Sequence, residues 1–160
     1  MERYRTHNEL DSNAKSASIA LLNARLADTL DLTMIAKQAH WNIKGRQFIG
    51  IHKMLDELHA ATDEYGDLIA ERVAALGGTA FGTAQVVAQK SSLPAYPTDI
   101  HKIEDHLRAL IDRYGRVANA VRANINETDE VGDAGTADLF TEVSRGLDKW
   151  LWFLEAHVQE

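Results

Sequence analysis

The chain has 160 residues, the length of one typical domain, and its 45% hydrophobic and 26% charged residues are those of an ordinary globular protein. It contains no cysteine, which excludes disulfides, thiolate metal sites and cysteine nucleophiles. No apolar run approaches the ~18 residues of a membrane span, so we expect a cytoplasmic protein that makes no membrane contact. The net charge of −7 argues against a chain whose main surface holds nucleic acid.

The first half of the chain predicts two long helices. Between residues 14 and 42, apolar side chains recur at three- and four-residue steps, and Ser12 or Asn13 can cap the start. A second helix is expected from residue 48 to about residue 76, where Gly77-Gly78 supplies a stop. Because only a few residues join them, the two helices are expected to lie antiparallel.

A long connection follows over residues 77–98. Its middle, residues 84–88, predicts a short helix, and its end, residues 93–97, is expected to be extended because it contains both prolines. A connection of this length lets the helices on either side of it run parallel, which is how ferritin-like four-helix bundles are connected. We therefore expect an all-α domain over residues 14–160, preceded by a flexible arm over residues 1–13.

The second half of the chain predicts the other two long helices. Thr98 is expected to cap a third helix that reaches about residue 126. An acidic, glycine-containing loop is expected over residues 127–135. Thr136 is expected to cap a fourth helix that ends near residue 157.

Four metal-ligating residues share one stripe of the second helix. His52 and Asp56 are four residues apart, and Asp67 and Glu71 repeat that spacing. At roughly 100° per residue, all four fall within about 100° of the helix face. Asp56 and Asp67, however, lie about 16 Å apart along the axis, too far to bind one ion together. Each pair alone is typical of a solvated helix face. The hypothesis of a metal site therefore rests on all four residues sharing one stripe.

A second copy of this helix can supply the missing half of such a site if the two copies pack antiparallel about a twofold axis. Pairing His52 with Glu71 of the second copy fixes the register. Asp56 then faces the second copy's Asp67, because the residue numbers of both pairs have the same sum. The axis falls near Ala61, where small side chains permit close approach. The spacing thus predicts two equivalent metal sites, each built from both chains.

Other residues near this stripe leave alternatives open. His40, near the end of the first helix, comes level with His52 in an antiparallel pair, so both imidazoles can point at one metal. His59 and Asp63 lie on the stripe near the axis, and a hydrogen-bonded interface pair is favoured over auxiliary metal ligands. Trp41 flanks the site, where core packing is favoured over a role as electron donor.

These residues resemble the signature of Dps, the family of bacterial mini-ferritins also called DNA protection during starvation proteins. The matching segments are Lys37-x-x-His40-Trp41-Asn42-x-x-Gly45-x-x-Phe48-x-x-x-His52-x-x-x-Asp56 and Asp67-x-x-x-Glu71-Arg72. Further matches extend the resemblance over nearly the whole chain. The resemblance implies a hollow dodecamer built from twofold dimers, whose ferroxidase centres oxidise Fe(II), preferentially with hydrogen peroxide, and pass Fe(III) to a mineral core.

The same resemblance implies roles for individual residues. The iron ligands would be His40, His52 and Asp56 of one subunit with Asp67 and Glu71 of its partner. Four acidic residues before and within the fourth helix resemble those that line the family's iron-entry pores: Asp129, Glu130, Asp133 and Asp138. The alternative is that they belong to a solvated loop.

DNA binding is where the chain departs from many Dps proteins, which carry a lysine-rich terminal arm. Residues 1–15 hold three basic and three acidic side chains, so the arm is formally neutral. A neutral arm on an acidic shell releases few counterions from DNA, so direct DNA binding is expected to be weak or absent. The alternative function is a DNA-binding, nucleoid-compacting protein, associated with the nucleoid, whose metal site is vestigial or structural.

Overall fold

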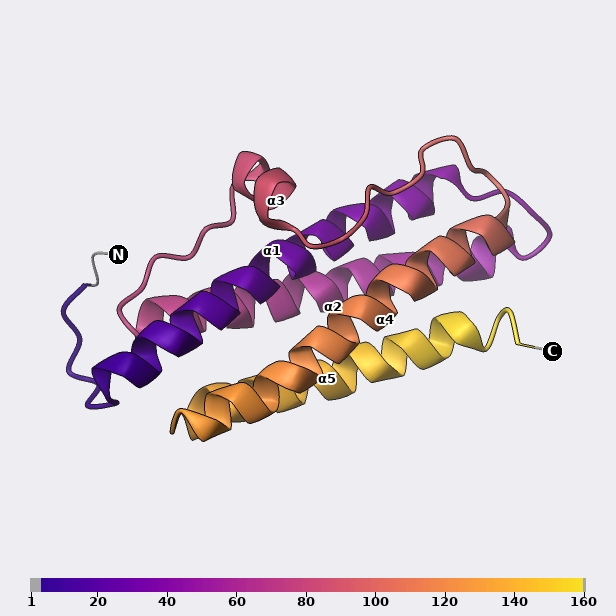
Figure 1. Cartoon of the computed structure of the whole chain (residues 1–160). Helices are drawn as coiled ribbons and strands as arrows, with labels where there is room; N and C mark the ends of the chain where they lie inside the picture. The colour runs from indigo at the N-terminus through magenta and orange to yellow at the C-terminus, as the bar shows by residue number, and fades with distance from the viewer. Residues whose placement is uncertain (1–3, 160) are drawn as a thin grey trace.

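A computed structural model describes residues 4–159, so the first three residues of the expected arm and the last residue of the chain lie outside the described part (Figure 1). Within it the chain forms five helices: α1 (Ser12–Asn42), α2 (Phe48–Ala75), α3 (Ala84–Lys90), α4 (Ile103–Glu130) and α5 (Ala134–Glu155). The expected all-α class is confirmed, as is the short helix in the long connection.

The four long helices form one bundle. α1 packs on α2 and α4 packs on α5, while the crossover carries α3 along the outer side of α1 before it enters α4 (Figure 1). Each long helix contributes fully buried leucines to a common core, among them Leu22, Leu55, Leu110 and Leu147. In the described residues, none of the helices combines the length and apolar character needed to cross a membrane.

The helix starts differ from the sequence expectations. α1 is capped by Asp11, whose carboxylate accepts the backbone N–H of Asn13 at 2.7 Å, so the expected cap at Ser12 or Asn13 is wrong by one or two residues. α4 begins at Ile103, so Thr98 is not its cap. The chain bends at Thr98 and Asp99, and the segment just before α4 is held by the carbonyl oxygen of His101, which accepts the N–H of Lys44, at 2.8 Å, across the end of the bundle.

The acidic loop expected over residues 127–135 is mostly helical. α4 continues to Glu130, and only three residues separate it from α5, with Gly132 at a φ of +87° making the turn. Thr128 is fully buried, which extends the packed face of α4 past the expected end. The cap of α5 is Asp133, which accepts the N–H of Thr136 at 3.0 Å, and not Thr136 itself.

The crossover is fixed to the bundle by buried charged side chains. Asp28 of α1 accepts the N–H of Ser92 at 2.7 Å and its hydroxyl at 2.9 Å. Arg113 of α4 donates to the carbonyl oxygens of Pro94 and Ala95, at 3.2 and 2.6 Å. These bonds satisfy an otherwise irregular backbone and hold the segment that leads back to the turn between α1 and α2.

Candidate metal centre

Two histidines meet where α1 ends and α2 begins. The rings of His40 and His52 stack with centroids 3.6 Å apart. Nδ1 of His40 lies 2.8 Å from the carbonyl oxygen of His52, and Nδ1 of His52 lies 3.0 Å from the carbonyl oxygen of His40. Because a carbonyl only accepts, both Nδ1 atoms carry the proton and both Nε2 atoms keep a free lone pair. Backbone contacts of this kind orient metal-binding imidazoles.

A carboxylate lies beside the two rings. Asp56, half exposed on α2, has an oxygen 3.7 Å from Nδ1 of His40 and receives a hydrogen bond from the ammonium of Lys37. That hydrogen bond is the main cause that lowers the pKa of Asp56 from its ordinary value. The carboxylate is therefore ionised, and a metal that binds it must compete with Lys37.

The pairing of Lys37 with Asp56 was not foreseen from the sequence. The signal was nevertheless present, because Lys37 lies three residues before His40 and so on the same face of α1. Three of the predicted ligands and a basic neighbour therefore lie near one another within a single chain.

The other two predicted ligands lie elsewhere on α2. Asp67 and Glu71 are exposed and do not meet the histidines of their own chain. Asp67 lines an open groove of about 560 Å³, whose other lining residues are mostly small and include Ala60, Gly66, Ala70, Ala80 and Gly82. In residues 4–159 of one chain, no group of three or more histidine or acidic side chains is placed to hold a metal ion by itself. The chain thus brings three of the five residues together and leaves two facing outward.

Arg72, next to Glu71, ties this part of α2 to the start of α5. Its Nε donates to the hydroxyl of Thr136 at 2.9 Å and its Nη2 to Asp133 at 2.8 Å. Asp133 is only 1% exposed, and burial alone would raise its pKa, but bonds from Thr136 and the charge of Arg72 outweigh burial and lower the pKa.

The four residues expected at an iron-entry pore differ in burial. Asp133 is buried and used in capping α5 and binding Arg72, so within the chain its role is structural. The other three are exposed, and their place in a pore stays a prediction: Asp129, Glu130 and Asp138.

The remaining candidates near the stripe behave differently from one another. His59 is half-buried, and its Nδ1 donates to the carbonyl oxygen of Thr33 on α1 at 3.0 Å. Asp63 is exposed and lines the same groove as Asp67. Trp41 is 68% exposed, so the expectation that it packs in the core is wrong for the single chain; it follows His40 on the outward face of the last turn of α1.

Comparisons with known proteins agree with this fold. A family model described as a ferritin-like domain matches residues 19–160, which defines the class of the bundle. The DNA protection during starvation protein of Agrobacterium fabrum is 58% identical, and the match covers 100% of this chain and 99% of that protein. The corresponding protein of Mycolicibacterium smegmatis is 32% identical over 92% of this chain and 81% of its own length. The chain belongs to the Dps family of ferritin-like proteins.

Solved structures show the same likeness. The Dps of Microbacterium arborescens, described as a high iron form, has a TM-score of 0.88 at 34% identity and covers 94% of this chain and 97% of its own. A Mycobacterium smegmatis Dps in a tetragonal crystal form has a TM-score of 0.94 at 30% identity, with 99% and 96% covered. The bundle and its crossover are therefore shared over nearly the full length.

Proposed function

We propose that this protein is a ferroxidase and iron store. Two copies bind Fe(II) between them, using His40, His52 and Asp56 of one copy and two carboxylates of the other, Asp67 and Glu71. The observation that carries the proposal is the reciprocal hydrogen bonding of His40 and His52. In the neutral rings it leaves both Nε2 atoms unprotonated, and the ionised carboxylate of Asp56 lies 3.7 Å from Nδ1 of His40, so two imidazoles and a carboxylate suited to Fe(II) lie near one another.

The exposed half of the site supports the sharing between copies. Asp67 lies in an open groove in which half of the lining residues are alanine or glycine, which favours close approach of a second helix. Asp67 and Glu71 have no hydrogen-bond partner among residues 4–159 that would compete for a metal. In the antiparallel register set by pairing His52 with Glu71, each groove would close over the other copy's histidines.

The donor set also supports the proposed oxidation. Two Fe(II) ions side by side can each give one electron to hydrogen peroxide, which with two protons becomes two molecules of water. Because both electrons are delivered together, no hydroxyl radical is released. The carboxylates favour the harder Fe(III) product, and the resulting ferric ions would be kept inside a hollow dodecamer. By this route the protein would protect DNA, which is the role given by the name of its Agrobacterium fabrum relative.

Subunit mixing tests the shared site. The His52→Ala variant lacks a ligand from one half of the site, and Glu71→Ala lacks one from the other, so neither homodimer has an intact centre. Co-assembled, every mixed dimer regains one intact centre, and random pairing should restore about one quarter of the wild-type rate of peroxide-dependent Fe(II) oxidation. His7→Ala, which removes an exposed histidine of the N-terminal arm, is the control and should keep the full rate.

The outcome separates the candidate functions. If the mixture oxidises no more Fe(II) than the separate variants, the site is not shared in this way. If the wild-type shell itself fails to oxidise Fe(II) with peroxide, the metal site is vestigial or structural, and the alternative of nucleoid compaction gains support.

We further propose that this protection involves little direct DNA binding. The arm is formally neutral over residues 1–15, and its described part lies against the bundle. The N–H of Tyr4 donates to the carbonyl oxygen of Gly77 at 2.8 Å, and Leu10 packs against the core. A neutral segment held this way offers few charges to DNA phosphates. Tight retention of plasmid in a gel-shift assay at low salt would contradict this.

A further inference from the structure

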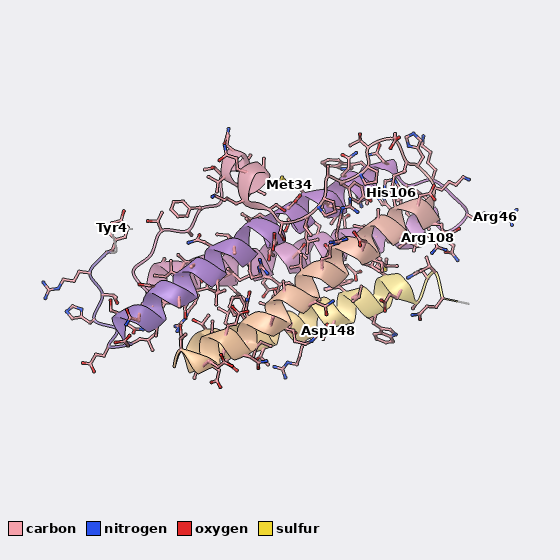
Figure 2. All side chains as sticks on the ribbon, viewed as in Figure 1. Tyr4, Met34, Arg46, His106, Arg108 and Asp148 are labelled. Atoms are coloured by element: carbon pink, nitrogen blue, oxygen red, sulfur yellow. The ribbon has the colours of Figure 1, made fainter. Side chains whose placement is uncertain are left out.

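A pocket of about 480 Å³ opens at the end of the bundle, and none of the proposed iron ligands lines it. It forms where the turn between α1 and α2, the start of α4 and the C-terminal segment meet. Figure 2 shows Arg46 and Arg108, two of its lining residues, at this same end of the molecule. Lys44 and Lys102 also line it, and their backbones are paired in a short parallel bridge.

The charge in this pocket is uncompensated. Among the described residues that line it, Glu104 is the one acidic residue, and Arg108 neutralises it by donating Nε and Nη2 to the same carboxylate oxygen, at 3.1 and 2.7 Å. Across residues 4–159, no acidic side chain pairs with Lys44, Arg46 or Lys102. Three exposed and unpaired cations therefore line one concavity of a chain whose net charge is −7.

Backbone groups add to this positive potential. α2 and α4 both begin at the pocket, and neither of their first flanking residues, Gln47 and Lys102, caps its helix through its side chain. The N–H of Phe48 donates to the carbonyl oxygen of Gly45 at 3.1 Å, and the later first-turn N–H groups of both helices have no side-chain cap. Both helix dipoles present their positive ends here, with Glu104 and Asp105 in the first turn of α4. Two helix starts and three unpaired cations around one hollow are complementary to an anion of several charges.

We propose that this pocket binds a small phosphate-bearing anion with at least two negative charges. The guanidinium of Arg46 offers a planar fork that matches phosphate oxygens, and the two lysines supply point charges around it. The concave shape favours a compact anion over a duplex, because a DNA backbone needs a row of cations along an open surface. The net charge of −7 also disfavours contact with a duplex outside the pocket. The site is separate from the iron-binding residues and does not depend on the proposed ferroxidase function.

Calorimetric titration of the assembled full-length protein with sodium tripolyphosphate at low salt tests the proposal. We expect binding at about one site per chain that weakens as salt is added. The double variant Arg46→Gln and Lys102→Gln should bind at least about tenfold more weakly, because each residue contributes a charge-assisted hydrogen bond. Arg145→Gln removes an exposed arginine of α5 outside the pocket and should leave the affinity unchanged.

Two further measurements keep the result decisive. Fe(II) oxidation by the double variant should stay at the wild-type rate, which shows that the shell is intact. Equal tripolyphosphate affinity in the double variant and the wild type would overturn the proposal, as would no binding to the wild type at low salt. In a parallel arm, retention of duplex DNA that the same two substitutions abolish would overturn the small-anion assignment in favour of a nucleic-acid backbone.

Discussion

Replacing Asp133 with alanine should destabilise the bundle more than any other change of an acidic residue at this end of it. The side chain is 1% exposed, caps α5 through the N–H of Thr136, and pairs with Arg72. Losing a cap costs about 1 kcal/mol. Removing one member of a buried ion pair costs about 3 kcal/mol, at the low end of the range because Arg72 keeps 23% of its side chain exposed. The expected loss is about 4 kcal/mol.

Urea unfolding followed by circular dichroism, at one fixed protein concentration, measures this loss. Asp129→Ala, which removes an exposed carboxylate near the end of α4, is the matched control and should change stability by less than about 0.5 kcal/mol. A loss below about 1 kcal/mol in Asp133→Ala would mean that the contact with Arg72 adds nothing beyond the cap, and the reasoning from burial would be refuted.

The pH dependence of the same variant gives an independent check. The pKa of Asp133 is lower in the folded chain than its ordinary value of 3.8, so the folded state holds the ionised form more strongly than the unfolded chain does. The stabilisation is therefore complete above about pH 4 and is lost as the pH falls through the folded-state pKa. The difference in stability between wild type and Asp133→Ala should shrink in acid.

Two further predictions concern His106 and Lys37. His106 is 1% exposed, accepts the hydroxyl of Tyr96 at 2.7 Å through Nδ1, and has its pKa lowered by burial. The neutral ring is the stable one in the fold, so stability should fall as the pH drops below its ordinary value of 6.5, and thermal melts of His106→Gln should lack this slope. Lys37→Met should bind Co(II), as a probe of the Fe(II) site, about two- to fivefold more tightly by absorption titration, because Asp56 no longer has a competing partner; unchanged affinity would mean that Lys37 does not compete.

Periodicity predicted the long helices because each buries a continuous apolar face, and it placed His40 level with His52 because the intervening turn is short. The caps were predicted less well. Thr98 has the right side chain for a helix start, but α4 begins only after His101, whose carbonyl oxygen is bonded to the N–H of Lys44, far away in sequence. Asp133 looked like part of a solvated loop because its partner, Arg72, is 61 residues away. Local patterns carry no information about such contacts.

The histidine arrangement shows how the fold creates a feature that the motif alone does not contain. If α1 continued by one more turn, the N–H of Lys44 would take the carbonyl oxygen of His40 as a helical acceptor. The helix ends at Asn42, and Lys44 donates instead to His101 of the crossover. The carbonyl oxygen of His40 accepts Nδ1 of His52 without a helical donor, whereas the carbonyl oxygen of His52, inside α2, accepts Nδ1 of His40 beside its helical donor.

The position of His40 against His52 thus depends on where α1 stops, and that end is held by a residue at the end of the long connection. A change that let α1 extend past Asn42 would displace the turn that returns the chain to α2, and with it the contact between the two rings. Both Nδ1 bonds, which keep the proton off Nε2 in the neutral rings, would then be lost while all five proposed ligand residues stayed in the chain. The crossover therefore helps to arrange the proposed metal centre although it supplies none of its ligands.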